Sequence, residues 1–281
     1  MRNITAVSGV LFAFTITMAA STIGNPTRPC GSCTTETFIN PVEASSRTVA
    51  EAVAHGHSFL IVDLASMSEC RALHAAAVDV ARDMEDARQG LKRFAVTDHL
   101  SDSMLELCDR ILLRLLSTLN DGIPALLPAL FGDALMPSTV IHNPRLDWSP
   151  HEPAINLYSA GGTFKPHEDE QSLTCLLNLS ESNEYNGGGT AFWHALEREE
   201  DGSIAFARSQ CERATPAHTC RPPPGKALVF GGQVTHAGVR VVDGLRVVFV
   251  ASFSPVPPRM ARGIGEALAP ESASDGARPK S

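Results

Sequence analysis

Apolar residues recur at helical spacing in two stretches of the N-terminal half of the chain. The first stretch follows a short apolar run at 59–63, which predicts a strand, and opens with the capping-box pattern Ser66-x-x-Glu69. Its apolar stripe consists of Leu73, Ala77, Val80, Met84 and Ala87. Gly90 follows the last turn of this stripe, so we expect the helix to end there.

A second helix is predicted from Ser103-x-x-Glu106, which repeats the capping pattern, to Gly122. Its stripe consists of Leu107, Ile111, Leu112, Leu115, Leu116 and Leu119. A stripe this apolar predicts a helix that is well buried against the rest of the fold. Cys70 and Cys108 fall on the apolar faces of the two helices, where cysteine behaves as a small hydrophobic residue.

From Ala154 onward the pattern changes to short apolar runs separated by Gly and Pro, which predict β-strands. These runs lie at 155–158, 172–179, 189–193, 203–207, 227–230, 239–242 and 246–253. Helices followed by many short strands predict an α+β fold, with packed sheets buttressed by helices on one side. Asp243-Gly244 lies between the last two runs and predicts a hairpin, which would place His236 and Arg246 in adjoining strands.

The two ends of the chain lack this periodicity. Residues 1–24 are typical of a signal peptide or membrane anchor, because an uncharged, moderately apolar run spans 4–24. Cleavage after Ser21, with Ala19 three residues before the cut, would fit the small-residue rule. We therefore expect entry into the secretory pathway or the endoplasmic reticulum, with a cytoplasmic or organellar location as the alternative.

We expect residues 25–50 to form a linker, 51–256 the folded domain and 257–281 a disordered tail. The barrel core of that domain would cover 154–253. Its long connection at 194–222 would form either a lid or a solvated insertion.

Charge and cysteine content narrow the functions further. The formal net charge is -8 at pH 7 and no Lys/Arg cluster occurs, so we expect no nucleic-acid partner. Cys211 and Cys220 lie in a polar loop and would form a disulfide in an oxidising compartment. Cys30 and Cys33 have redox or zinc spacing, but no second Cys/His pair lies nearby, so we interpret them as part of the linker.

The residues that point to chemistry are His167, Asp169 and His236. Side chains alternate along a strand, so His167 and Asp169 would point the same way, whereas Glu168 and Glu170 would point away. Two imidazoles and one carboxylate form the facial triad of non-haem Fe(II) oxygenases, which leaves neighbouring coordination positions open. The sequence therefore predicts an iron site.

Three motifs together resemble the signatures of the Fe(II)/2-oxoglutarate dioxygenases, within them the prolyl 4-hydroxylase-like branch. They are Y-S-A-G-G-T-F-K-P-H-E-D at 158–169, Gly187-Gly188-Gly189-Thr190, and His236-Ala237-Gly238 followed by Arg246. The resemblance implies a double-stranded β-helix, a jelly-roll barrel with its site at the mouth. It also implies hydroxylation of a C–H bond, coupled to decarboxylation of 2-oxoglutarate to succinate.

This resemblance also implies the ligands of the site. Fe(II) would be held by the three metal-binding side chains named above, with 2-oxoglutarate and O2 as cosubstrates and ascorbate as a further candidate. Arg246 would grip the distal carboxylate of 2-oxoglutarate in a bidentate fork. Tyr158 and Thr190 would add hydroxyl donors, and Arg240 is the alternative cation.

The sequence leaves the substrate open. Phe164 stands where prolyl hydroxylases usually carry a second Tyr, Gly189 replaces the usual acid, and Arg246 replaces a Lys common in collagen-type members. The substrate would be a protein side chain, prolyl included, or a small molecule. A zinc peptidase is excluded, because neither His-Glu pair has a His at the position that H-E-x-x-H requires. The remaining alternative is a non-catalytic, metal-binding jelly-roll module that binds or senses a ligand.

Overall fold

The computed structural model describes residues 50, 53, 58–132, 137–193, 211 and 214–256. The expected signal peptide and tail, the linker apart from its last residue Ala50, the Cys30–Cys33 pair, the run at 203–207 and most of the 194–222 connection lie outside these residues. Within the part that is described, no helix has both the length and the apolar character needed to cross a bilayer.

The helices are α2 (Met67–Ala81), α3 (Val96–His99), α4 (Asp102–Gly122) and α5 (Leu126–Phe131). The strands are β1 (Phe59–Asp63), β2 (Leu91–Ala95), β3 (Leu146–Trp148), β4 (Ala154–Tyr158), β5 (Phe164–His167), β6 (Leu173–Asn178), β7 (Tyr185–Gly187), β8 (Thr190–Phe192), β9 (His218–Cys220), β10 (Lys226–Phe230), β11 (His236–Gly238), β12 (Val241–Gly244) and β13 (Arg246–Pro255).

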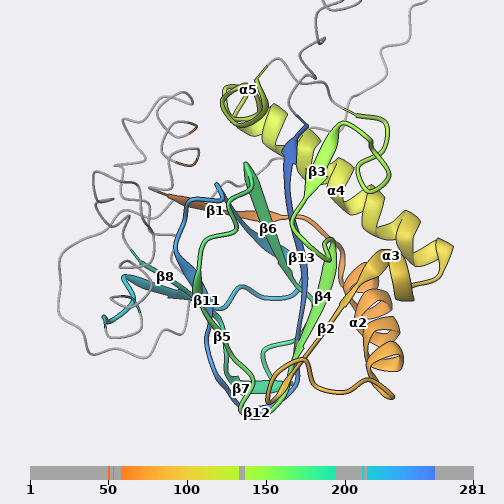
Figure 1. Ribbon diagram of the computed structural model, residues 1–281, viewed down its shortest axis with the longest axis vertical. Helices are drawn as coiled ribbons and strands as arrows, with labels where there is room; N and C mark the ends of the chain where they lie inside the picture. The colour runs from red at the N-terminus through yellow and green to blue at the C-terminus, as the bar shows by residue number, and fades with distance from the viewer. Residues whose placement is uncertain are drawn as a thin grey trace, which may run out of the picture.

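These strands pair antiparallel in a large and two smaller sheets. The large, seven-stranded sheet has the order β1-β10-β6-β13-β4-β2, with β3 added along β13. A four-stranded sheet has the order β5-β11-β8-β9, and β12 pairs with β7. The helices lie on one side of the large sheet and the four-stranded sheet lies on the other (Figure 1). The predicted combination of antiparallel sheets with helices on one side is confirmed.

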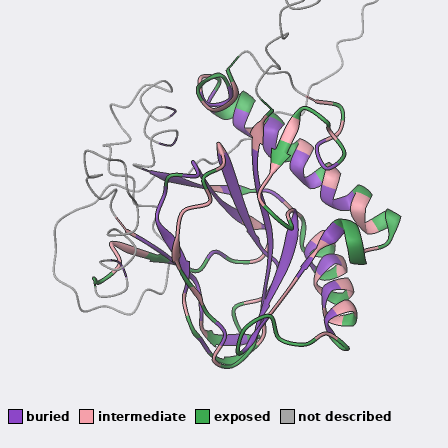
Figure 2. Ribbon diagram, viewed as in Figure 1, coloured by how far each residue is buried: buried purple, intermediate pink, exposed green. Residues whose placement is uncertain are grey.

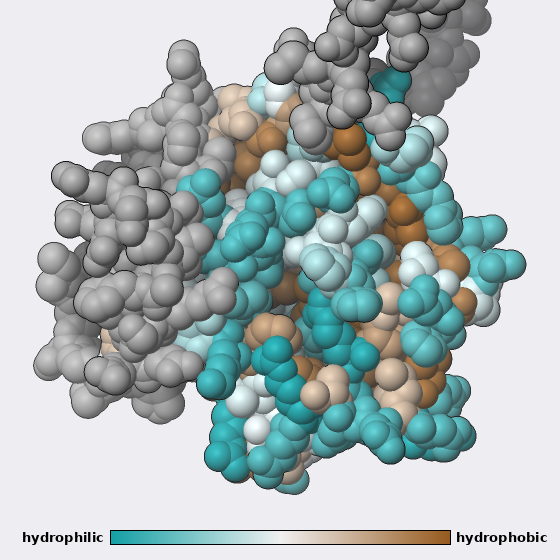
Figure 3. Space-filling view, viewed as in Figure 1, coloured by the Kyte–Doolittle hydropathy of each residue, from teal (hydrophilic) through white to brown (hydrophobic). Residues whose placement is uncertain are grey.

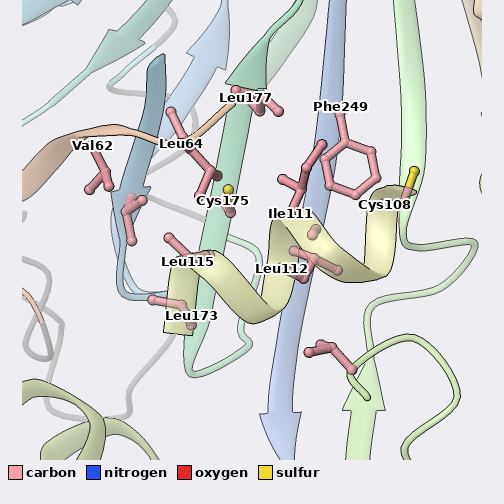
Figure 4. Close-up of a cluster of buried hydrophobic side chains, with 14 of the residues drawn as sticks. Val62, Leu64, Cys108, Ile111, Leu112, Leu115, Leu173, Cys175, Leu177 and Phe249 are labelled. Carbon is pink, nitrogen blue, oxygen red and sulfur yellow. The ribbon is translucent and has the colours of Figure 1, made fainter. Parts of the chain in front are cut away.

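The large sheet buries both of its faces because its strands alternate their side chains between two apolar clusters. On the helical face, Ile111 and Leu115 of α4 pack toward Leu177 and Phe249 of the sheet (Figure 4). On the other face, residues such as Phe230 fill the space between the sheets. Figure 2 shows α2 and α4 with a buried stripe and an exposed outer surface. On the face of the molecule shown in Figure 3, the described residues are mostly hydrophilic, with smaller hydrophobic areas between them.

The first helix ends earlier than predicted. α2 stops at Ala81, and Ala87 is exposed, because the segment 82–89 is mostly charged or polar and offers no apolar stripe to bury. The chain then enters β2, a strand that the pattern did not predict. Gly90 turns the chain into this strand with a φ of 69°, and a Cβ there would come within 2.5 Å of the backbone nitrogen of Gly162.

The two capping patterns have different outcomes. Ser66 and Glu69 form the reciprocal capping box at the start of α2, as predicted. The second helix begins two residues earlier than its pattern indicated, with Ser101 as N-cap and no side-chain cap bond. Its predicted end at Gly122 and its buried stripe are confirmed.

Replacing Glu69 with alanine should lower the free energy of unfolding by about 1–2 kcal/mol at pH 7. Its carboxylate accepts from the Ser66 backbone nitrogen at 2.7 Å and from both Nη atoms of Arg114 at 2.8 and 2.9 Å. The hydrogen bonds from Arg114 lower the pKa of Glu69 to about 2. Because the folded-state pKa is depressed, this contribution is present above pH 4.5 and is lost as the pH falls toward 2. Urea denaturation across this range measures it.

Glu106→Ala is the matched control for this experiment. Glu106 belongs to the capping pattern that does not form, it is 75% exposed, and its carboxylate reaches only to 4.0 Å from Arg110. Its replacement should change stability by less than about 0.5 kcal/mol. Equal effects of the two substitutions would show that the capping box contributes nothing specific.

The predicted hairpin at Asp243-Gly244 does not form. β12 pairs with β7, whereas β13 pairs with β4 and β6 in the large sheet. Gly244, with a φ of 82°, lets the chain cross between sheets at a point where its backbone touches that of Glu184. His236 and Arg246 therefore belong to different sheets and not to adjoining strands.

The end of the 194–222 connection also differs from expectation. It contributes β9, which extends the four-stranded sheet along β8. Cys211 is a thiol in this structure, so the Cys211–Cys220 disulfide expected for an oxidising compartment is not formed here. Burial and the charge of Glu168 raise the pKa of Cys211, whereas Cys220 is buried in the apolar cluster between the sheets. The sulfur atoms of Cys211 and Cys220 therefore lie in different environments.

Candidate active site

A cavity of about 330 Å³ lies between the large sheet and the four-stranded sheet. The residues singled out in the sequence all line it: Tyr158, His167, Asp169, Thr190, His236 and Arg246. They come from β4, β5, β8, β11 and β13 and from the turn after β5. The fold thus brings together residues from three distant motifs.

At one end of the cavity the two histidines turn the same nitrogen toward Asp169. Nδ1 of His167 lies 2.8 Å from the Lys165 carbonyl oxygen, and Nδ1 of His236 lies 3.1 Å from that of Val234. A carbonyl only accepts, so each Nδ1 carries a proton, and Nε2 is the nitrogen of each ring that can offer a lone pair. Those Nε2 atoms lie 3.3 and 3.6 Å from the carboxylate oxygens of Asp169.

Burial keeps the Nε2 lone pair of His236 available. Burial lowers the pKa of His236 to about 4, so the ring is neutral at pH 7. Burial opposes ionisation of Asp169, but the two neighbouring histidines and the hydrogen bond from Thr174 outweigh it and hold its pKa below the usual range. Acceptor atoms that converge in this way form a site that suits a cation.

Asp169 is held in place from two sides. Thr174 Oγ1 donates to Asp169 Oδ2 at 2.7 Å and lies 2.9 Å from Ser252 Oγ. The backbone nitrogens of Asp169 and Glu170 both donate to the Gly232 carbonyl at 3.1 Å. Supporting contacts of this kind orient metal ligands in proteins.

Strand alternation does not position Asp169, so the prediction that it would was wrong. Alternation nevertheless selected a residue that the structure places beside both histidines. β5 ends at His167, which lies directly opposite His236 in β11, and Asp169 follows in a turn. The bonds to Gly232 bring it back toward the histidines. Glu168 does not point away from the site: it lines the same cavity, and its Oε1 accepts from Thr235 Oγ1 at 3.1 Å.

The donor set fits Fe(II). Atoms of His167, Asp169 and His236 lie within 4.8 Å of one another, and their side chains line the cavity. Two imidazole nitrogens and one carboxylate oxygen on one side of an ion leave its other positions open, as in non-haem iron sites. Their assignment as iron ligands stays a prediction.

At its other end the cavity holds a buried cation. Arg246 is 3% exposed, its Nη2 donates to Thr190 Oγ1 at 3.2 Å, and its Cζ lies 5.4 Å from the centre of the Tyr158 ring. Its Nε has no hydrogen-bond partner. In the described ranges no carboxylate forms a salt bridge with Arg246, and burial lowers its pKa. Arg240, the alternative cation, is exposed and does not line the cavity.

The sequence patterns missed part of the cavity wall: Arg93, Glu152 and Asn156. Arg93 lies on β2, which the pattern did not predict, so its position could not be inferred. Asn156 lies two residues before Tyr158 in a predicted strand, so alternation alone could have placed both on one face.

No protein-family model matches this chain, and no curated protein matches it. It is similar in structure to a viral collagen prolyl hydroxylase from Paramecium Bursaria Chlorella virus-1, with 15% identity over 73% of this chain and 99% of that one, and a TM-score of 0.43. A Pseudomonas putida prolyl-4-hydroxylase is 17% identical, covering 75% of this chain and 99% of its own, with a TM-score of 0.45.

A third similar structure is HygX from Streptomyces hygroscopicus with nickel and 2-oxoglutarate bound. It is 13% identical over 74% of this chain and 85% of that one, with a TM-score of 0.49. These names agree with the superfamily whose motifs the sequence resembles. Because the TM-scores lie below 0.5, the function of this chain has to be inferred from the residues of its own site.

Proposed function

We propose that this chain is an Fe(II)- and 2-oxoglutarate-dependent dioxygenase that hydroxylates a C–H bond. The observation that carries this proposal is the division of one cavity into two ends. Lone pairs of His167, Asp169 and His236 converge at one end, and the buried cation Arg246, whose Nε has no hydrogen-bond partner, lies at the other. The first end calls for a metal ion and the second for an anion.

At the Arg246 end of the cavity, the hydrogen bonds show which donor protons remain available to a ligand. Thr190 Oγ1 accepts from Arg246, so its own proton remains available. The Tyr158 hydroxyl lies 3.1 Å from Asn156 Nδ2 and accepts from it, so the phenol proton is available too. Arg246 Nε–H adds a further donor. A buried cation with spare donors is costly, and a carboxylate satisfies both the charge and the hydrogen bonds.

A dicarboxylate with a 2-oxo acid group at one end and a simple carboxylate at the other suits both ends of the cavity. Arg246, Thr190 and Tyr158 would bind the distal carboxylate, while the 2-oxo acid would bind the metal held by the histidines and Asp169. The metal with 2-oxoglutarate and O2 supplies the oxidising chemistry when bound. The chain itself orients the cosubstrate and, with the apolar cluster between the sheets, excludes water from it.

We infer that the two facing antiparallel sheets form the double-stranded β-helix, the jelly-roll, that the motifs imply. The position of the cavity between the sheets supports this fold, since the mouth of such a barrel is a common ligand site. A location in the secretory pathway, membrane attachment through residues 4–24, a need for ascorbate and a prolyl substrate all remain proposals from the sequence.

The competing function is a non-catalytic module that binds a metal ion and an anion in the same cavity. We expect purified protein with Fe(II), 2-oxoglutarate and O2 to form succinate, slowly without a prime substrate and faster with the right one. Succinate measured by mass spectrometry across a panel of peptides and small molecules tests this and finds the substrate class. A chelator should abolish the signal. Binding of 2-oxoglutarate without any iron-dependent succinate across the panel would favour the binding module.

A further inference from the structure

We propose that Asn156 is a positioning residue for Tyr158. The ion pair of Arg93 and Glu152 orients Asn156, and Asn156 in turn orients the Tyr158 hydroxyl so that it donates a hydrogen bond to the distal carboxylate of 2-oxoglutarate. This inference rests on the proposed function and concerns the same cavity. It assigns a role to three polar residues of the cavity wall, Arg93, Glu152 and Asn156, which take no part in the proposed metal site or in the proposed contacts of Arg246.

The starting point is an ion pair in the wall of the cavity. Arg93 Nη2 lies 2.8 Å from Glu152 Oε1, and the side chains are 21% and 5% exposed. The other oxygen of Glu152 accepts from the Ser252 backbone nitrogen. Glu152 is thus held by a strand of the sheet and in turn fixes the guanidinium of Arg93, which leaves its remaining donors to face Asn156.

The direction of the next two hydrogen bonds follows from what each group can do. Arg93 Nη1 lies 2.9 Å from Asn156 Oδ1, and a guanidinium can only donate, so the amide oxygen must face Arg93. The amide nitrogen then faces the Tyr158 hydroxyl at 3.1 Å and donates to it. The phenol oxygen therefore acts as an acceptor in this bond. Asn156 is 4% exposed, so water has little room to replace either partner.

The phenol proton must then point elsewhere. Tyr158 is 5% exposed, and in the described part of the chain no acceptor for this proton is present. Tyr158 lies opposite Arg246 in the register of β4 and β13, and both line the cavity. The proton is thus available beside the guanidinium, where the distal carboxylate would lie. The chain of bonds from Glu152 to Tyr158 fixes a donor at this place and disfavours any ligand group that also needs to donate there.

Asn156→Asp tests this chain of bonds because it keeps the shape and reverses the second bond. An aspartate accepts from Arg93 and also from the Tyr158 hydroxyl, so the phenol proton is drawn away from the ligand. The dissociation constant of 2-oxoglutarate should rise about tenfold or more, the effect of losing one hydrogen bond to a charged group. Fe(II) affinity, measured separately by anaerobic titration, should stay unchanged because the Asn156 side chain bonds to Arg93 and Tyr158 and not to the predicted metal ligands.

A spectroscopic measurement separates positioning from a general loss of structure. The chain contains two tyrosines, so the difference between wild type and Tyr158→Phe isolates the phenol C–O stretch of Tyr158 in the infrared spectrum of the tyrosine-labelled protein. This band responds to whether the hydroxyl donates. In the wild type it should shift when 2-oxoglutarate binds, and in Asn156→Asp it should not. A shift of equal size in both proteins would overturn the inference.

Two further variants test whether the charge added by Asn156→Asp weakens binding by repelling the ligand directly. The substitution is repeated in a Tyr158→Phe background, where its effect should shrink because the redirected hydroxyl is absent. An undiminished effect there would contradict the proposal. Asn156→Leu removes both bonds without adding charge and should weaken 2-oxoglutarate binding less than Asn156→Asp; a larger loss would also contradict it.

Failure of this inference is distinguishable from failure of the proposed function. If the wild type does not bind 2-oxoglutarate at all, the proposed function is wrong and the role of Asn156 falls with it. If 2-oxoglutarate binds and is turned over but the infrared band of Tyr158 does not shift on binding, only the positioning role is wrong.

Discussion

Asp169→Ala is expected to abolish Fe(II) binding and turnover while the fold persists. The substitution removes the one carboxylate that both Nε2 atoms of His167 and His236 face, and with it the only negative charge of the predicted ligand set. Changes to groups that merely support a ligand already cost about 10–100-fold in metal affinity, so loss of a ligand should cost at least that. Anaerobic titration with Fe(II) measures the affinity, and thermal denaturation without metal measures the fold.

His167→Ala and His236→Ala should behave like Asp169→Ala in the same titration. The matched control is Glu168→Ala, which removes a neighbouring carboxylate that also lines the cavity but accepts from Thr235. This variant should still bind Fe(II). If Glu168→Ala lost iron as completely as Asp169→Ala, the carboxylate of the site would have been misassigned.

Arg246→Gln should raise the concentration of 2-oxoglutarate required for turnover about thirtyfold or more, because a partly buried charge-assisted pair is worth ~2–5 kcal/mol. Arg246 is the buried cation of the cavity and has no carboxylate partner in the described chain, so the ligand supplies the charge that balances it. Fe(II) affinity should remain near that of the wild type, since the guanidinium is not part of the predicted ligand set. Binding of 2-oxoglutarate and release of succinate are both measured.

Two variants sharpen this prediction. Arg246→Lys keeps the charge but loses the planar fork, so its requirement for 2-oxoglutarate should be intermediate. Arg240→Gln removes a cation that is exposed and lies outside the cavity lining, and it should match the wild type. Equal dependence on 2-oxoglutarate in the wild type and in Arg246→Gln would refute the assignment of Arg246, and Arg240 would become the cation to test.

Much of this site could be predicted from the sequence because its signals are local or are spaced motifs. The capping box at Ser66 and the buried stripe of α4 follow from helical periodicity. Six strands after Ala154 follow from short apolar runs between Gly and Pro, namely β4, β6, β8, β10, β12 and β13, whereas β5, β7, β9 and β11 match none of these runs. The motifs also selected six residues that line one cavity, since each carries a functional group for which an apolar core has little use.

Tertiary structure decided the rest, because it depends on pairing between segments far apart in the chain. The turn that carries Asp169 is set by bonds to the Gly232 carbonyl, and Arg246 meets Thr190 only because two different sheets face each other. Arg93 lies beside the cavity because β2 pairs with β4. The charged residues of β2 break the apolar pattern that would have predicted a strand. The sequence by itself therefore determined which residues are the candidates for the chemistry. The long-range packing of the sheets determined how those residues face one another, and with it the direction in which Tyr158 can donate.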